Sequence, residues 1–252
     1  MMTKPAVAAS QSDQARNKII VALDVATADE ARAIVGELGG RVGAFKIGLQ
    51  LFTGAGPTFV RDLAATHKIF LDLKFHDIPT TVARASVEAA KLGVWMFNVH
   101  TLGGGDMMRA AMAAVDEVYS REDASRPLII GVTLLTSSDA AVMTEVGLRG
   151  ETGDRVVSLA RLAHTSGLDG VVASPIEVTA IKRAIPDAAF LAVTPGIRGN
   201  LATGDDQKRV TSFRRALAGG SDFVVIGRPI TAAADRAAAV EQLVDEVAEG
   251  AE

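Results

Sequence analysis

Apolar runs alternate along the chain with longer segments in which alanine and other apolar residues recur at helical spacing. The runs are rich in β-branched residues, as strands are, and occupy residues 19–25, 42–49, 68–75, 96–101, 127–135, 170–174, 190–196 and 222–228. The amphipathic segments between them include 28–38, 80–93, 105–120 and 154–167. This alternation predicts parallel strands, because parallel neighbours are joined by crossover helices.

Eight strand–helix units in 252 residues match the usual size of a (β/α)8 barrel, the TIM barrel. A doubly wound open sheet is the alternative. It more typically has fewer strands and a Gly-rich turn after the first one, where this chain has LDVATADE. The pattern shows no linker and no domain boundary. We therefore predict a flexible N-terminal tail at residues 1–17 and one α/β domain, the catalytic barrel, at 18–252.

Composition narrows the functional classes. Hydrophobic residues make up 48% and charged residues 22%, as in ordinary globular proteins. The chain has no cysteine, which excludes disulfides and thiolate chemistry and suits a reducing cytoplasm. A net charge of -4 argues against a general nucleic-acid binder. No apolar run approaches the roughly 20 residues of a membrane helix, so we expect a cytoplasmic protein without a membrane or nucleic-acid partner.

Charged residues interrupt the third apolar run, whose sequence continues as IFLDLKFHDIPTTV. Burying a charge is unfavourable unless it is paired, but the functional face of a barrel lies at the C-terminal ends of its strands. Asp72 and Lys74 are two residues apart, so both should face the barrel mouth. Asp24 ends the first run and Lys46 lies near the end of the second. Neighbouring strands would then present alternating negative and positive charges.

Three interpretations of these charges are open. A structural ion-pair network is the simplest. The second is a catalytic array, favoured by the further acid Asp77, since two acids flanking one lysine suggest electrostatic stress or a lysine held protonated for proton delivery. The third is a metal site, with Asp72, Asp77, His76 and His100 as ligands. The ammonium groups of Lys46 and Lys74 would occupy the place of the cation, which disfavours this site.

The end of the chain supplies a candidate anion site. The last predicted strand ends in Gly227 and Arg228 and leads directly into a helix. Barrel enzymes frequently bind phosphate at the loops after strands seven and eight, with backbone N–H groups and a helix N-terminus. Gly227 permits close approach of the backbone, and Arg228 can bind phosphate oxygens. Arg198, in the long segment 195–209 after the seventh strand, is a second candidate.

The segments DLKFHDIPTT, TPGIR, GDDQKRV and IGRPI, in this order, resemble the orotidine 5′-monophosphate decarboxylase family from about residue 18 to about residue 245. The D-x-K-x-x-D core is shared with keto-gulonate-phosphate decarboxylases and hexulose-phosphate synthases. The HDIP segment that follows this core, and the PGIR and DDQKR segments, narrow the resemblance from this wider superfamily to the orotidine 5′-monophosphate decarboxylases. Ser212 stands near a helix start where many relatives have Thr-Pro, and it can serve there as an N-cap.

The resemblance implies a decarboxylation of orotidine 5′-monophosphate to uridine 5′-monophosphate that needs neither metal nor cofactor. Lys74 would donate a proton to C6 of the pyrimidine, and Asp72 would face the substrate carboxylate. Lys46 and Asp24 would bind ribose hydroxyls and complete the charge array. A magnesium-dependent decarboxylase or aldolase acting on a sugar phosphate is the alternative within the superfamily. A non-catalytic phosphate-binding barrel is the alternative outside it.

The resemblance also implies a homodimer, with Asp77 and Thr81 reaching into the neighbouring subunit's site. Thr136 would contact the pyrimidine. The residues implied to contact the phosphate or to belong to the lid are Arg198, Gln207, Gly227 and Arg228.

Overall fold

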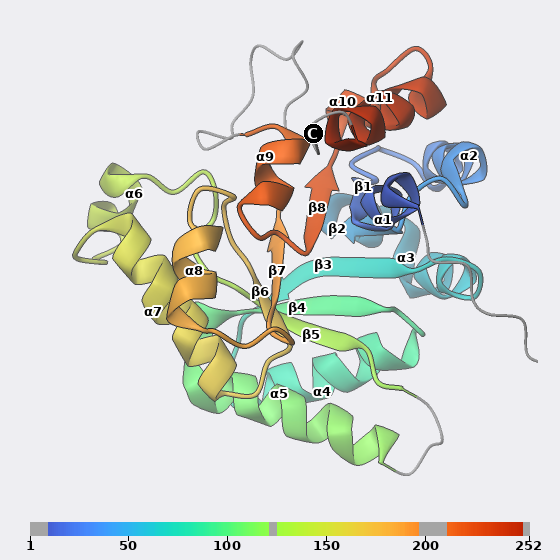
Figure 1. Ribbon diagram of the computed structural model, residues 1–252. Helices are drawn as coiled ribbons and strands as arrows, with labels where there is room; N and C mark the ends of the chain where they lie inside the picture. Colours follow the sequence, from blue (N-terminus) through green and yellow to red (C-terminus); the bar gives the residue numbers. More distant parts are fainter. Residues whose placement is uncertain (1–9, 121–124, 197–210, 249–252) are drawn as a thin grey trace, which may run out of the picture.

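Parallel strands close into a barrel, and within the described residues they number eight. The computed structural model describes residues 10–120, 125–196 and 211–248. Each strand pairs with the next in sequence, and β8 pairs with β1 (Figure 1). This closure confirms the predicted (β/α)8 barrel and excludes the open sheet. The strands are β1 Ile19–Ala22, β2 Ala44–Gly48, β3 Ile69–Phe75, β4 Met96–His100, β5 Leu128–Val132, β6 Gly170–Val172, β7 Leu191–Thr194 and β8 Phe223–Ile226.

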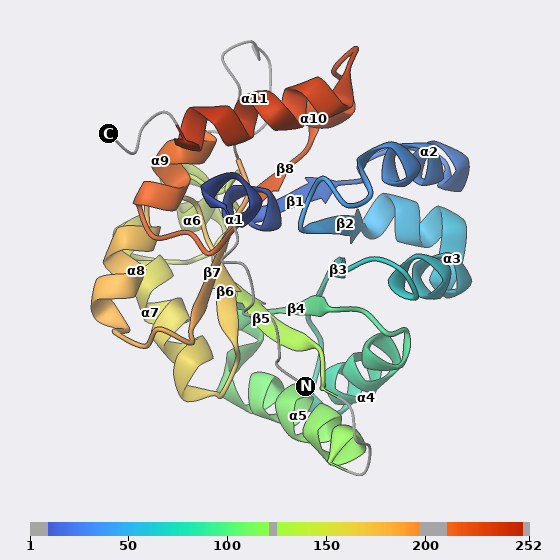
Figure 2. The ribbon, with the colours of Figure 1, turned by 45° about the vertical axis from the view of Figure 1, so that its right-hand side comes forward.

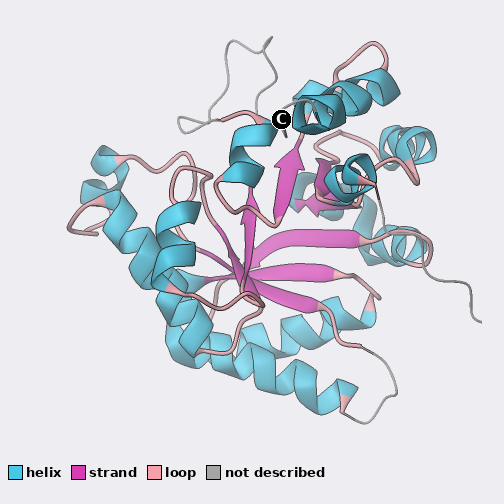
Figure 3. Ribbon diagram, in the orientation of Figure 1, coloured by secondary structure: helices cyan, strands magenta, loops and turns pink. Residues whose placement is uncertain are grey.

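Helices surround the barrel, with the strands at the centre (Figure 3). The helices that follow the eight strands in turn are α2 Ala28–Leu38, α3 Leu49–Ala64, α4 Pro79–Lys91, α5 Gly104–Tyr119, α7 Thr152–Thr165, α8 Val178–Ala184, α9 Phe213–Ala218 and α11 Arg236–Ala248. Shorter elements at the strand ends are η1 Thr101–Gly103, α6 Ala140–Glu145 and α10 Arg228–Thr231. No helix within the described ranges is long and apolar enough to cross a membrane.

Local sequence signals fix several helix starts. Thr27 and Glu30 form a capping box at α2, in which each side chain accepts a hydrogen bond from the other residue's backbone N–H. Pro79 occupies the first turn of α4, where its missing N–H is no loss. Ser212 caps α9 by accepting a hydrogen bond from the Arg215 N–H, as its position predicts.

Alternation along each strand separates two apolar regions. One set of strand residues, including Val21, Ile47 and Leu71, packs outward against the helices. The other set fills the barrel interior and comprises Ile20, Ala22, Ala44, Phe70, Met96, Ile130, Val193 and Val225. In β2, β3 and β4 this interior set continues, two residues further along, with Lys46, Asp72 and Asn98, and Asp24 stands two residues beyond Ala22, the last residue of β1. The barrel interior is therefore apolar towards the N-terminal ends of these strands and polar towards their C-terminal ends.

The predicted N-terminal tail needs a correction. Its last seven residues form α1, Gln11–Asn17, which begins with a capping box between Ser10 and Asp13. The helix buries Ala15, and Arg16 pairs with Glu241 of α11. Figure 2 shows α1 close to α11, against which it packs. The prediction was wrong here because a helix of two turns carries little periodicity of its own, and its stability comes from packing.

Candidate active site

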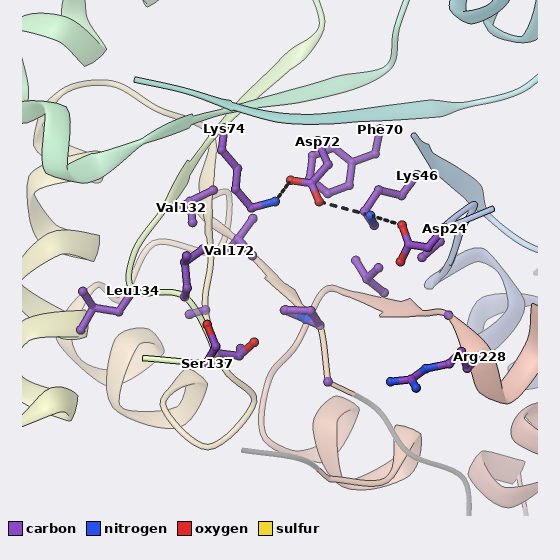
Figure 4. A pocket seen from close by; sticks show the side chains of 18 of the residues that line it. Asp24, Lys46, Phe70, Asp72, Lys74, Val132, Leu134, Ser137, Val172 and Arg228 are labelled. Carbon is purple, nitrogen blue, oxygen red and sulfur yellow. Dashed lines mark hydrogen bonds and ion pairs between the residues drawn. The ribbon is translucent and has the colours of Figure 1, made fainter. Parts of the chain in front are cut away.

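A pocket of about 550 Å³ opens at the C-terminal ends of the strands. This volume lies in the range of ligand sites. Its walls combine charged groups from β1 to β3 with apolar side chains such as Val132, Leu134 and Val172 from β5 and β6 and the residues that follow β5 (Figure 4). Pro195, Gly227 and Arg228 contribute from the ends of β7 and β8. The site therefore lies on the predicted face of the barrel.

Four side chains form a continuous line of ion pairs along one wall, which we call the charged row: Asp24, Lys46, Asp72 and Lys74 (Figure 4). The Lys46 ammonium lies 3.1 Å from Asp24 Oδ1 and 3.3 Å from Asp72 Oδ2. The Lys74 ammonium lies 2.7 Å from Asp72 Oδ1. The predicted alternation of charges across three neighbouring strands is confirmed.

The two central members of the row are strongly coupled. Burial alone would raise the pKa of Asp72, but the charges of Lys46 and Lys74 and hydrogen bonds from Lys74 and Asn98 outweigh it and lower that pKa below its usual value. Burial likewise opposes the charge of Lys46, but Asp72 and Asp24 raise its pKa. Asp72 and Lys46 are therefore both ionised near pH 7. The row offers fixed charges of both signs to a ligand.

Lys74 has an unusual backbone. Its φ is 52°, and no other non-glycine residue among those described has a positive φ. The pairing of β3 with β4 shifts register between Leu71 and Phe75, as at a β-bulge. We expected Lys74 beside Asp72 because side chains two residues apart on a regular strand point the same way. The two side chains do lie together, but β3 is not regular at this point. The strand is distorted there, and the side chain still lines the pocket.

Asn98 is a site residue that sequence reasoning missed. It lies in β4 and is fully buried, and its side-chain Nδ2 donates to Asp72 Oδ1 over 2.6 Å. Its Oδ1 accepts a 2.7 Å hydrogen bond from the backbone N–H of Lys74. The signal was present, because Asn98 is a polar residue within the apolar run MFNVH and two residues from Met96, which faces the barrel interior.

The residues after β3 lie outside the charged row within this chain. Asp77 and Thr81 are exposed and do not line the pocket, and Asp77 Oδ1 accepts the N–H of Ile78 over 2.6 Å. Among the described acids only Asp72 pairs with Lys74, so the lysine that two acids flank within a single chain is Lys46, between Asp24 and Asp72. In the described residues no three acids or histidines gather as metal ligands, so Asp72, Asp77, His76 and His100 do not form one site.

His76 and His100 stack instead, with ring centroids 5.3 Å apart. Burial, together with His76 and Lys74, lowers the pKa of His100 to about 4. The ring of His100 is therefore neutral near pH 7. It adds no charge to the row.

The anion side of the pocket lies at the end of β8. Gly227 precedes the first residue of α10, and Arg228 begins this short helix. Figure 4 shows Arg228 apart from the charged row. Thr136 and Ser137, which follow β5, also line the pocket. The structure thus brings Gly227, Arg228 and Thr136 to the pocket as predicted, whereas Arg198 and Gln207 lie outside the described residues.

The closed barrel and the ionised groups at its C-terminal mouth define a (β/α)8-barrel enzyme. Comparison with known proteins then assigns the family. The model of the orotidine 5′-phosphate decarboxylase / HUMPS family matches residues 17–243, so the chain belongs to this family.

Individual relatives agree with this assignment. The orotidine 5′-phosphate decarboxylase of Syntrophotalea carbinolica is 49% identical over 237 residues, which cover 93% of this chain and 96% of that protein. The protein of the same name from Trichlorobacter lovleyi is 47% identical, with coverages of 94% and 98%. A crystal structure of the Lactobacillus acidophilus orotidine 5′-phosphate decarboxylase superposes with a TM-score of 0.79 at 39% identity, over 91% of this chain and 98% of that chain.

Proposed function

We propose that this chain decarboxylates orotidine 5′-monophosphate to uridine 5′-monophosphate and carbon dioxide in pyrimidine biosynthesis, with its barrel as one catalytic domain and without a metal ion or cofactor. The observation that carries the proposal is the charged row, in which Asp72 is held between two lysine ammonium groups at the pocket wall. Relatives that bear the name of this activity support it over nearly their whole length.

The chemical difficulty is the negative charge that develops at C6 when carbon dioxide leaves. An enzyme accelerates this step only if it binds that charge more strongly than the starting carboxylate. In the proposal Lys74 lies beside C6, stabilises the developing carbanion and then gives it a proton. A fixed ammonium does this without reorganisation at the moment of reaction. Asp72 holds this ammonium at 2.7 Å and faces the departing carboxylate.

The remaining pocket residues bind the parts of the nucleotide that do not react. Lys46 and Asp24, at the other end of the charged row, hydrogen-bond the ribose hydroxyls. Thr136 contacts the pyrimidine. Gly227 and Arg228 bind the phosphate, for which a forked guanidinium beside backbone N–H groups is well suited, and Arg198 and Gln207 are proposed to complete this side. Binding energy from the remote phosphate serves to align the ring for reaction.

The proposal includes a homodimer whose sites are shared. Exposed leucine and isoleucine side chains follow three neighbouring strands, β2, β3 and β4, at the C-terminal face of the barrel: Leu49 is 57% exposed, Ile78 64% and Leu102 42%. Asp77 and Thr81 lie on either side of Ile78 in the sequence, are exposed, and do not line the pocket of their own chain. A second copy of the chain covering this face would bury these apolar side chains. It would also bring Asp77 and Thr81 of each chain to the pocket of the other chain.

The activity is tested by following the ultraviolet absorbance of orotidine monophosphate in excess EDTA. Conversion to uridine monophosphate is the expected result. No conversion, with turnover of a sugar phosphate once magnesium is restored, would contradict the proposal and favour the magnesium-dependent decarboxylases or aldolases.

The shared site is tested by mixing two inactive variants, Lys74→Ala and Asp77→Ala, after subunit exchange. A hybrid dimer would contain one site with both native residues. Random exchange therefore restores about a quarter of the wild-type activity if the sites are shared between two-fold related chains. No recovery in a mixture shown to contain hybrids would place Asp77 in its own chain's site or in none.

A further inference from the structure

Asn98 joins the two unusual features of the pocket, the charged row and the left-handed backbone of Lys74. Its amide oxygen accepts the Lys74 N–H at 2.7 Å, and its amide nitrogen donates to Asp72 Oδ1 at 2.6 Å. We infer that Asn98 is a positioning residue that fixes both the main chain of Lys74 and the carboxylate that orients its ammonium. The inference rests on the proposed function, in which Lys74 is the proton donor.

The hydrogen bond to the backbone replaces one that the sheet does not supply. In a regular parallel ladder the N–H of Lys74 would bind a carbonyl of the neighbouring strand. The register shift between Leu71 and Phe75 interrupts this ladder, and the Asn98 side chain takes the N–H instead. A positive φ is unfavourable for a lysine and persists where the surroundings fix it. Asn98 is the residue whose side chain hydrogen-bonds this backbone directly, at the Lys74 N–H.

The second hydrogen bond acts on the partner of the Lys74 ammonium. Asp72 Oδ1 receives both Lys74 Nζ and Asn98 Nδ2, while Oδ2 faces Lys46 Nζ at 3.3 Å. Both carboxylate oxygens are therefore held, and the plane of the carboxylate is fixed. Lys74 is consequently constrained at its two ends, at the backbone by Asn98 Oδ1 and at the ammonium by a carboxylate that Asn98 orients.

Few other side chains meet both requirements at this position. The site needs one acceptor and one donor on a short branch, which an asparagine amide supplies. An aspartate would accept the Lys74 N–H but would face Asp72 with a second carboxylate. Alanine or leucine would leave the partly buried Lys74 N–H without this partner, which is unfavourable. Asn98 is fully buried, so water does not readily replace it.

Asn98→Ala is the first variant to measure, with Thr101→Val as its matched control. Thr101 is also fully buried at the end of β4, and its hydroxyl donates to the Val132 carbonyl at 2.8 Å. Both variants lose buried hydrogen bonding, but only Asn98 contacts the charged row. We expect Asn98→Ala to lower kcat roughly 10²-fold, as a misplaced catalytic group does, with a much smaller change in KM. Thr101→Val should lose thermal stability and keep its kcat.

Asn98→Asp separates positioning from mere structural support. The new carboxylate keeps the acceptor for Lys74 but repels Asp72, and the pair is relieved when it takes up one proton, whose O–H can then bridge the two acids. We therefore expect kcat of this variant to recover towards the wild-type value as the pH falls, while that of Asn98→Ala stays low at each pH. A purely structural role would not produce this difference in pH profile.

The inference is overturned if a folded Asn98→Ala keeps wild-type kcat, or if Asn98→Asp shows the wild-type pH profile. Should Asn98→Ala fail to fold, the profile of Asn98→Asp decides. If the wild type does not convert orotidine monophosphate, the proposed function is wrong, but this result alone does not decide the role of Asn98. Crystal structures of Asn98→Asp and of the wild type then test whether Asn98 positions Lys74. Lys74 keeping both its positive φ and its Asp72 contact in that variant would then overturn the inference, and loss of either would support it.

Discussion

The two ends of the barrel both carry ion pairs, but they hold them in different ways. At the N-terminal end, Asp169 precedes β6 and accepts hydrogen bonds from Arg126 at 2.7 and 2.9 Å and from the Ile129 N–H at 2.7 Å. Asp222 precedes β8 and accepts Lys182 and the Ala192 N–H, each at 2.7 Å. Each acid thus ties the start of its own strand to the backbone of a neighbouring strand.

At the C-terminal end, within the part of the chain that the structure describes, no side chain of the charged row accepts a hydrogen bond from a backbone N–H of a neighbouring strand. The one such link at this level is made by Asn98, which accepts the Lys74 N–H. The members of the charged row contact one another and face a pocket, and one of them has a left-handed backbone. At the opposite end, the hydrogen bond with Asp169 raises the pKa of Arg126 despite the opposing effect of burial, and the Arg126 guanidinium is held by both Asp169 and Asp116. Similar residue types therefore stabilise the barrel at one end and leave their charges available to a ligand at the other.

The largest expected effect is a loss of activity, caused by removing Lys74 from the charged row at the C-terminal end of the barrel. Lys74→Ala removes proton delivery, typically worth 10²–10⁴-fold, and the fixed positive charge beside C6, so kcat should fall by about 10⁴-fold or more. The fold should persist, because Lys74 is partly exposed and its backbone stays in place. Orotidine monophosphate turnover and a thermal melt measure the two effects. Near-normal turnover would remove Lys74 from the role of proton donor.

Asp169→Ala should give the reverse result at the N-terminal end. The variant leaves the Ile129 N–H without its acceptor and removes the paired bonds to Arg126, which keeps Asp116 as a partner. We expect a loss of about 2 kcal/mol in the free energy of unfolding, since a buried donor is left unpaired. For a chain of this size that lowers Tm by roughly 4–8 °C, while kcat stays at the wild-type value.

Glu88→Ala is the control for this variant, because it removes an exposed acid that pairs with Lys91 on α4. Such a surface pair contributes less than about 1 kcal/mol. Equal melting temperatures for the two variants, or a large loss of kcat in Asp169→Ala, would break the division of roles between the two ends of the barrel.

Arg228→Ala tests whether the C-terminal end also binds substrate away from the charged row. Losing one charge-assisted contact of about 1.5–3 kcal/mol should raise KM roughly 10- to 150-fold with a smaller effect on kcat. Arg61→Ala, near the end of α3, removes the same charge from an exposed site outside the pocket and should leave KM unchanged. An unchanged KM in Arg228→Ala would mean that the phosphate binds elsewhere.

The sequence predicted the strands well but not where each strand ends. Residues 127–135 form one apolar run, yet β5 is only Leu128–Val132. The residues after it leave the sheet, and Leu134 and Leu135 line the pocket. Apolar composition continues because a ligand pocket needs apolar walls as a sheet does. Composition alone therefore does not distinguish a strand from the wall beyond it.

The site shows a similar division. The charged residues could be found because charges in apolar runs need partners, and barrel topology brings the strand ends together. The conformation of Lys74 could not be found, since nothing in DLKFHD marks a bulge, and lysine is not a residue that favours a positive φ. That conformation arises from the pairing of β3 with β4 and from Asn98, both of which are contacts distant in sequence.

The smallest expected effect concerns this conformation. Lys74→Gly and Lys74→Ala should both be inactive, but they differ in how they accept a φ of 52°. A left-handed backbone is unfavourable for alanine by roughly 1–2 kcal/mol, whereas glycine adopts it freely and loses about 0.5–1 kcal/mol through its more flexible unfolded chain. The glycine variant should therefore be more stable than the alanine variant by up to about 1.5 kcal/mol in urea unfolding. If alanine were the more stable variant, residue 74 would not hold the left-handed backbone in solution. The left-handed backbone would then no longer distinguish the charged row from the ion pairs at the N-terminal end.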